Sequence, residues 1–201
     1  KTIFSVQFLM EGVNRGESVL YVAFEEKKEE FYENMKNSGI DLEKAEKTGK
    51  FMFLEYSPEK VKMMLDEGGG SIESIIIKNK IQRMIIDSIT SFSLLFPDEL
   101  SKRQACIALF DIIRKWNCTT LFTAQHNPSD REEKNVPSVE FEADSIILLY
   151  YASINNKRER FIEILKMKGT NHSREIHKFE ITKKGIIIGA KAKVNKKELN
   201  D

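Results

Sequence analysis

The sequence has few cysteines, and those it has do not form a recognisable motif. Cys106 and Cys118 are the only two among 201 residues. They are not spaced as C-x-x-C, and no histidine lies near them in the sequence. This excludes a metal site of the cysteine-pair type, so we expect two reduced thiols in the core.

Long apolar runs and net charge are also lacking. No run approaches the roughly 18 apolar residues that span a bilayer, and the given residues contain no secretory h-region, so we expect a cytoplasmic protein without a membrane partner. The 32 lysines and arginines nearly cancel the 31 aspartates and glutamates. There is thus no global field to attract nucleic acid or an anionic membrane, and such a partner would need a local site.

The length and the apolar content suit one α/β domain. With 41% hydrophobic residues in 201, the chain can bury a sizeable core. We expect a single domain over residues 1–190, followed by a lysine-rich tail over residues 191–201.

Strand-length apolar runs alternate with helical patterns along most of the chain. The predicted helices are residues 28–38, 72–80 and 101–116, and the predicted strands are residues 18–24, 51–54, 84–87, 119–124 and 145–151. Strands that are apolar on both faces and separated by helices are typical of a parallel sheet covered by helices on both faces.

The pattern changes after residue 151. The segments "ERFIEILKMKG", "EIHKFEIT" and "GIIIG" read as consecutive strands, joined by the turn signals "NN" and "KKG". We expect an antiparallel meander that extends one edge of the sheet.

The first residues form an informative pair. Lys1 and Thr2 stand before a mostly apolar helical pattern, as do the last two residues of the phosphate-binding loop G-x-x-x-x-G-K-[ST]. In such a loop the lysine reaches the β- and γ-phosphates and the hydroxyl holds Mg²⁺. We expect the glycines to lie upstream of Lys1, so that the sequence begins inside the motif. An arbitrary boundary is the alternative.

Polar side chains follow three of the predicted parallel strands, where ligands bind in open α/β sheets. Glu25 and Glu26 follow the first strand, Asp87 ends "RMIID", and Gln125 follows "TTLFTA". Beside a phosphate, one glutamate can orient and deprotonate water while its neighbour tunes that basicity. Asp87 would hold Mg²⁺ or its water, and Gln125 would hydrogen bond to the γ-phosphate.

Each of these residues also has an ordinary structural interpretation. Asp87 could be a helix N-cap or a turn former. Glu25 and Glu26 begin "EEKKEE", which is typical of a solvated helix face. Gln125 could be a polar strand end. The residues alone leave these alternatives open.

The segment "ILKMKGTNHS" carries two lysines at strand spacing. Alternation predicts that Lys166 and Lys168 share a face with Ile162 and Ile164, with the two ammonium groups about 7 Å apart. Such a pair suits a polyphosphate. The alternative is an edge strand that lysines protect from aggregation.

Taken in order, these segments resemble a known family. "KT" before an apolar helix, "YVAFEE", "RMIIDSIT", "EFEADSIILLYY" and "ILKMKGTNHSREIHKFEITKKGIII" are similar to the KaiC-type ATPases of the RecA superfamily. The likeness extends to about Ile188, and "KMKGTNHS" after "ADSIILL" is its most specific part. It implies a RecA-like P-loop NTPase core that forms a ring, commonly a hexamer, with ATP between neighbouring subunits.

The resemblance also implies roles for individual residues. Glu25 and Glu26 match the catalytic glutamates, and Asp87 matches the aspartate linked to Mg²⁺. Lys166 and Lys168 match residues that reach the γ-phosphate of the next subunit. The implied nucleotide contacts are Lys1, Thr2, Asn37, Lys166, Met167, Lys168, Thr170, His172 and Thr182.

Two positions depart from the family. Family members often have arginine at the position of Lys168. Lysine lacks the bidentate fork of arginine, so stabilisation of the transition state would be weaker. Glu140 and Phe141 stand where phosphorylating domains have adjacent serine and threonine. We therefore expect ATPase activity without comparable autokinase activity.

Three functions remain open on sequence alone. The first is a ring ATPase whose hydrolysis alters its contacts with regulatory proteins. The second is a motor or recombinase that binds nucleic acid, which residues 127–139 disfavour, because Arg131 and Lys134 are offset by three acids and no aromatic offers stacking. The third is a nucleotide-sensing module with negligible turnover.

Overall fold

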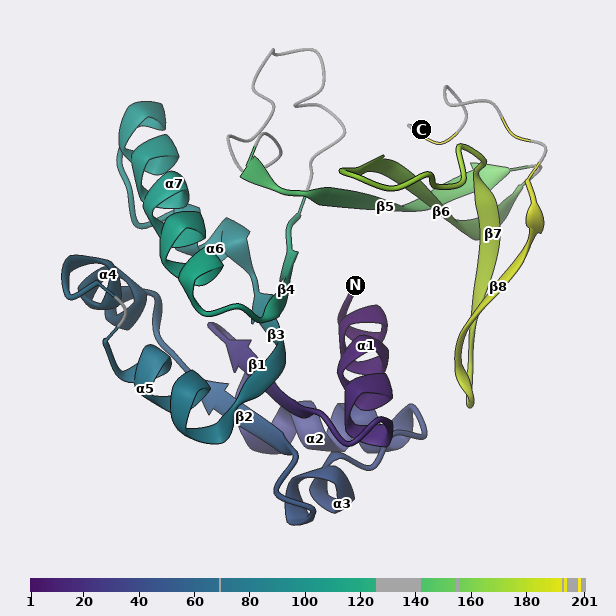
Figure 1. Cartoon of the computed structure of the whole chain (residues 1–201). Coiled ribbons are helices and arrows are strands. Elements are labelled where there is room, and N and C mark those ends of the chain that lie inside the picture. Colours follow the sequence, from purple (N-terminus) through teal and green to yellow (C-terminus); the bar gives the residue numbers. More distant parts are fainter. Residues whose placement is uncertain (69, 126–141, 155, 193, 195–198, 200–201) are drawn as a thin grey trace. The chain divides into compact units, whose positions relative to one another are not determined.

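The computed structural model of the chain describes residues 1–68, 70–125, 142–154, 156–192, 194 and 199. The chain divides into two compact units, Lys1–Gln125 and His126–Asp201. Each unit has its own four-stranded sheet (Figure 1).

The first unit alternates helices with parallel strands in the sheet order β2-β1-β3-β4. In the part of the chain that the structure describes, no helix has both the length and the apolar character to cross a membrane. The elements are α1 (Thr2–Asn14), β1 (Ser18–Ala23), α2 (Lys28–Asn37), α3 (Leu42–Lys47), β2 (Phe51–Glu55), α4 (Pro58–Asp66), α5 (Gly70–Asn79), β3 (Ile81–Asp87), α6 (Ile89–Ser93), α7 (Glu99–Lys115) and β4 (Thr119–Thr123).

Helices cover both faces of this sheet (Figure 1). On one face, Tyr21 of β1 is buried in a cluster with Phe31 of α2 and with side chains of α1 and α3, and Leu121 of β4 packs against the same cluster. Successive strand residues point to opposite faces, so Phe122 lies on the other face. There it stacks on Phe110 of α7, with ring centroids 4.8 Å apart.

Helix α1 approaches the sheet most closely at Gly12. A Cβ atom at this position would lie 2.9 Å from Val19 Cγ1 and 3.0 Å from Arg83 Cδ. Val19 is fully buried, and Arg83 is held by an ion pair with Glu17 and by a 3.0 Å hydrogen bond to the Phe8 carbonyl. Neither neighbour can move away freely.

We therefore expect Gly12→Ala to destabilise the protein, although alanine favours helix. Overpacking should cost about 2 kcal/mol of folding free energy, and the higher helix propensity of alanine should return about 1 kcal/mol. The free energy of unfolding should therefore fall by about 1 kcal/mol. Urea unfolding measures this loss, and in a Val19→Ala background the cost of Gly12→Ala should shrink. A more stable Gly12→Ala variant would contradict the close contact.

The second unit is an antiparallel sheet in the order β5-β6-β7-β8. Its core includes Ala152, Phe161 and Leu199. Leu199 falls in the segment that we predicted to be a tail, and it is 6% exposed. The strands are β5 (Ser145–Ile154), β6 (Lys157–Met167), β7 (His177–Thr182) and β8 (Gly185–Lys191).

The predicted fold class is confirmed, with two differences in topology. The parallel sheet covered by helices and the antiparallel C-terminal part are both present. However, residues 145–151 do not continue the parallel series, and the meander forms its own sheet instead of adding to an edge of the first. Two parallel strands that are consecutive in the chain need a long crossover connection between them. Ile154 at the end of β5 pairs instead with Lys157 at the start of β6, so the connection is short and the two strands are antiparallel.

The two cysteines are free thiols. Cys106 is buried, and burial raises the pKa of its thiol to about 11. Burial also raises the pKa of the half-buried Cys118 thiol. Both thiols are therefore held in their unreactive protonated form near neutral pH.

Candidate functional site

The four parallel strands end at a common edge of the first sheet. Ala23 at the end of β1 pairs with both Glu55 of β2 and Asp87 of β3, and Asp87 pairs with Thr123 of β4. The segments that follow β1, β3 and β4 therefore begin side by side. This is the edge at which open α/β sheets bind their ligands.

Two hydroxyl groups hold the carboxylate of Asp87. Tyr21 Oη donates to Oδ2 at 2.6 Å, and Thr123 Oγ1 donates to Oδ1 at 2.5 Å. Burial raises the pKa of Tyr21, and the nearby Asp87 charge and the hydrogen bond raise it further, so the phenol stays protonated and donates. Ser88, not Asp87, caps helix α6, which excludes the N-cap alternative for Asp87.

Glu25 and Glu26 lie between β1 and α2 rather than on a helix face. Helix α2 begins at Lys28, so the solvated-helix alternative does not apply to these two residues. The carboxylate of Glu25 accepts a hydrogen bond from the Ser91 hydroxyl of α6. Glu26 accepts one from the side-chain amide of Asn34 in α2, at 3.3 Å.

Glu55 at the end of β2 anchors the start of α2. Its Oε1 accepts a 3.0 Å hydrogen bond from the Lys28 backbone N–H, and Lys27 Nζ lies 3.1 Å from its Oε2. The backbone donor of Lys28, followed by the Lys27 side chain, lowers the pKa of Glu55. A carboxylate at a helix N-terminus is favourable, and here it fixes the chain just after the two glutamates.

Helix α1 also begins at this edge. Lys1 occupies the N-cap position without a side-chain capping bond, and its Nζ donates to the carbonyl of Ala124, just past β4, at 3.2 Å. Thr2 is the first helical residue. The N–H groups in the first turn of a helix lack intrahelical partners and point at this edge, where they suit an anion such as phosphate.

Gln125 lies one residue beyond Ala124, and its backbone N–H donates to Thr90 Oγ1 of α6 at 2.8 Å. The edge therefore gathers Lys1, Thr2, Glu25, Glu26, Asp87 and Gln125. Asn37 does not join them, because α2 carries it about 13.5 Å along the helix from Lys28, at 1.5 Å per residue.

The remaining predicted residues belong to the second unit. Lys166 and Met167 end β6, and Lys168, Thr170 and His172 follow it.

Lys168, His172 and Thr182 have polar partners within the second unit, and His172 Nδ1 lies 2.9 Å from the Ser173 carbonyl oxygen. Lys168 Nζ lies 3.1 Å from Asp144 Oδ1, and its backbone N–H donates to the Asp144 carbonyl at 2.8 Å. The Thr182 hydroxyl donates to the Gly185 carbonyl at 3.0 Å, in the turn between β7 and β8.

The predicted alternation along β6 is wrong at one point. Ile147 pairs with Ile164 and Ile146 pairs with Lys166, so Leu165 is an extra residue in the ladder. Such a bulge breaks the strict alternation of faces, and Lys166 does not simply continue the face of Ile164. Strand β6 pairs with β7 only at Arg160, Phe161 and Ile162, so Lys166 lies beyond that pairing. The alternative that Lys166 and Lys168 protect an edge strand from aggregation therefore stays open.

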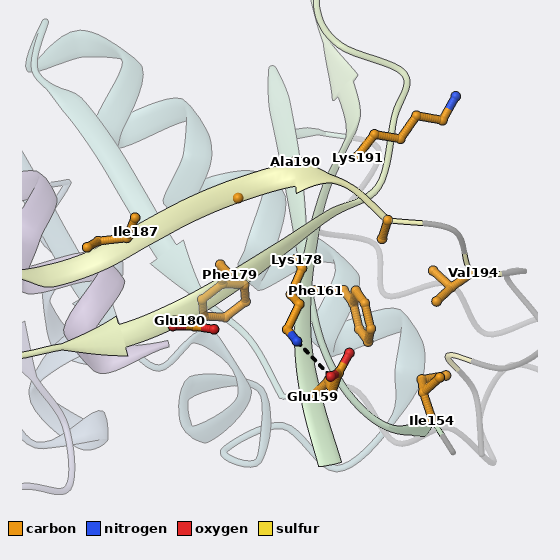
Figure 2. A pocket seen from close by; sticks show the side chains of 12 residues that line it. Ile154, Glu159, Phe161, Lys178, Phe179, Glu180, Ile187, Ala190, Lys191 and Val194 are labelled. Carbon is orange, nitrogen blue, oxygen red and sulfur yellow. Dashed lines mark hydrogen bonds and ion pairs between the residues drawn. The ribbon is translucent and has the colours of Figure 1, made fainter. Parts of the chain in front are cut away.

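Two hollows lie away from the predicted residues. One of about 470 Å³ in the second unit is lined by residues of all four of its strands and by Ala192 and Val194, and it contains the ion pair of Lys178 with Glu159 (Figure 2). The other, of about 430 Å³, lies at the opposite edge of the first sheet beside Arg83 and Thr119. Among the described residues, neither is lined by a predicted site residue.

Sequence reasoning did not find several residues that build the edge. Tyr21 and Thr123 fix Asp87, Ser91 bonds Glu25, and Glu55 anchors α2. A hydroxyl or carboxylate at or near a strand end can indicate a residue of the site. The sequence does not say which residue it bonds to, because that depends on the strand register. Residues 127–139, which we predicted to form a pore loop, lie outside the described residues, as do Glu140 and Phe141.

Taken together, the first unit is an α/β ligand-binding fold with a fixed carboxylate, a glutamate pair and a helix N-terminus at one sheet edge. The family model described as "ATPase: KaiC" matches residues 1–193. The chain belongs to the KaiC family of ATPases, as the motifs predicted.

Individual relatives agree with this family. The chain is 34% identical over 196 residues to the "Circadian clock protein KaiC3" of Synechocystis, covering 94% of this chain and 39% of that protein. It is 32% identical to a "UPF0273 protein" of Thermotoga maritima, covering 94% of this chain and 82% of that protein. The crystal structure of the KaiC-like protein PH0186 from Pyrococcus horikoshii matches with a TM-score of 0.81 and 28% identity, over 94% and 83% of the two chains.

Proposed function

We propose that this protein binds ATP with Mg²⁺ at the carboxyl edge of the first sheet and hydrolyses it. The observation that carries the proposal is the Asp87 carboxylate, held on both oxygens and placed by strand register next to the segment that bears Glu25. Membership of an ATPase family supports the same reaction.

The donor set at the edge fits magnesium. Mg²⁺ prefers oxygen ligands and keeps several waters, and it is usually bound by one or two carboxylates together with substrate phosphates. Asp87 and the Thr2 hydroxyl would be its protein contacts. Among the described residues, no group of three or more histidine, cysteine, aspartate and glutamate side chains could hold a metal ion alone, which agrees with a metal shared with the substrate.

Each residue at the edge has a distinct role in the proposed reaction. Lys1 would neutralise charge on the β- and γ-phosphates. Glu25 would orient and deprotonate the attacking water, with Glu26 tuning its basicity. Gln125 would hydrogen bond to the γ-phosphate.

The residues of the second unit would serve a neighbouring subunit. In a homo-oligomeric ring, which we propose to be a hexamer, Lys166 and Lys168 would reach the γ-phosphate bound next door. Thr170 and His172 would lie near the sugar of that nucleotide, and Met167 would contact the nucleotide as well. Thr182 would contact it more peripherally, as would Asn37 of the first unit. We propose that hydrolysis in this cytoplasmic ring regulates partner proteins, without autokinase activity.

Phosphate release by the native-length protein tests the proposal. We expect release that requires ATP and Mg²⁺, stops with EDTA, and is lost in Asp87→Asn. The Asp98→Asn variant is a matched control, since Asp98 is exposed and bonds to Ser101 at the start of α7. Tight ATP binding without release would favour the nucleotide-sensing module instead, and absence of both binding and release would reject the site.

A further inference from the structure

Helix α6 presents a buried hydroxyl to the carboxylate of Glu25. Ser91 is 7% exposed, and its Oγ donates to Glu25 Oε1. Its oxygen also lies 2.8 Å from Ser88 Oγ. Glu25 itself is exposed, so this hydroxyl is the contact that limits how its side chain swings.

The helix that carries Ser91 is held firmly. Ser88 caps it by accepting from the Ser91 backbone N–H at 3.3 Å. Phe92 is fully buried and packs edge-to-face on Phe96, with centroids 5.2 Å apart. On its other side, Thr90 accepts from the Gln125 backbone N–H. The first turn of α6 thus connects the segments that follow β1 and β4.

We propose that Ser91 is a positioning residue for Glu25, and that it holds the carboxylate in the orientation from which it acts on the attacking water. This inference rests on the proposed ATPase function and adds a residue that the sequence motifs did not include. Ser91 does not touch the nucleotide in this account, because it acts through Glu25.

The physical reason is the freedom of a glutamate side chain. A general base is effective only within hydrogen-bond reach of its proton, and Glu25 has several side-chain torsions through which an exposed carboxylate can leave that position. A hydrogen bond to a charged group opposes this motion, and its loss is expected to lower kcat about 10-fold.

Three variants of α6 in the native-length protein test the proposal. We expect Ser91→Ala to lower kcat about 10-fold while the affinity for ATP stays within about twofold, since binding does not need Glu25. Ser91→Thr retains the hydroxyl and should recover most of the rate. Ser93→Ala is the matched control, because Ser93 lies on the same helix and donates only to the Thr90 carbonyl, so its rate should not change.

A double-mutant comparison separates positioning from a general structural effect. Ser91→Ala added to Glu25→Gln should cause no further loss, because the residue acts through the carboxylate. An equal loss in both backgrounds, or an equal loss in Ser93→Ala, would overturn the proposal. If the unaltered protein releases no phosphate, the proposed function fails first; if it releases phosphate and Ser91→Ala does not slow it, only this inference fails.

Discussion

Replacing Lys166 with alanine is expected to slow ATP hydrolysis by the assembled protein about 10³-fold, the lower end of the range for a cationic finger supplied by a neighbour. The ammonium group would neutralise charge that develops on the γ-phosphate during transfer. Single-turnover phosphate release measures this rate. Lys157→Ala is the matched control, since Lys157 is an exposed lysine at the other end of the same strand.

Mixing two variants tests whether, in the proposed ring, the lysine acts in its own subunit or in the next. Lys166→Ala subunits keep Glu25, and Glu25→Gln subunits keep Lys166. A competent site therefore forms only where a Lys166→Ala subunit supplies Glu25 and the adjacent Glu25→Gln subunit supplies Lys166. At equal random mixing we expect recovery at about a quarter of the interfaces, since contacts in a ring are head to tail. No recovery above the two separate proteins would mean that the lysine does not act across subunits.

Glu25→Gln is expected to reduce kcat by about 10²- to 10⁴-fold, the usual effect of removing a general base. The amide can still hydrogen bond to water but cannot accept its proton. The affinity for ATP should be nearly unchanged, because Lys1, Thr2 and Asp87 bind the nucleotide in the proposed site. Phosphate release and titration with a fluorescent ATP analogue measure the two effects separately.

The neighbouring glutamates provide controls for that prediction. Glu29→Gln changes an exposed carboxylate in the first turn of α2 and should leave the rate unaltered. Glu26→Gln should have a smaller effect than Glu25→Gln, since Glu26 is expected to tune its neighbour. A Glu25→Gln variant with full activity would exclude Glu25 as the base.

The parallel sheet could be predicted because its signal is local. Strands buried on both faces must be apolar, and residues 19–23 of β1 and 84–86 of β3 are such runs between helical patterns. The position of the candidate site could be predicted by the same reasoning, since polar residues directly after parallel strands gather at one edge of the sheet. Glu25, Asp87 and Gln125 were predicted in this way, and they lie at that edge.

The partners of these residues could not be predicted in the same way. Tyr21 and Asp87 are 66 residues apart, and Thr123 is 36 residues from Asp87. Their contact depends on strand order and register, and a shift by one residue would turn each side chain to the other face. The bulge at Leu165 is another such case, because nothing in the strict alternation of the segment indicates an extra residue.

The sequence by itself determined the kinds of element, the family and the residues proposed to bind nucleotide, because periodicity and ordered motifs are properties of the chain alone. Only the tertiary structure decided that β5 belongs to a separate antiparallel sheet and that Tyr21, Thr123 and Ser91 hold the carboxylates. Those outcomes depend on pairings between distant segments. A hydrogen bond acts over about 3 Å, so these bonds form only once folding has set the strand order and register.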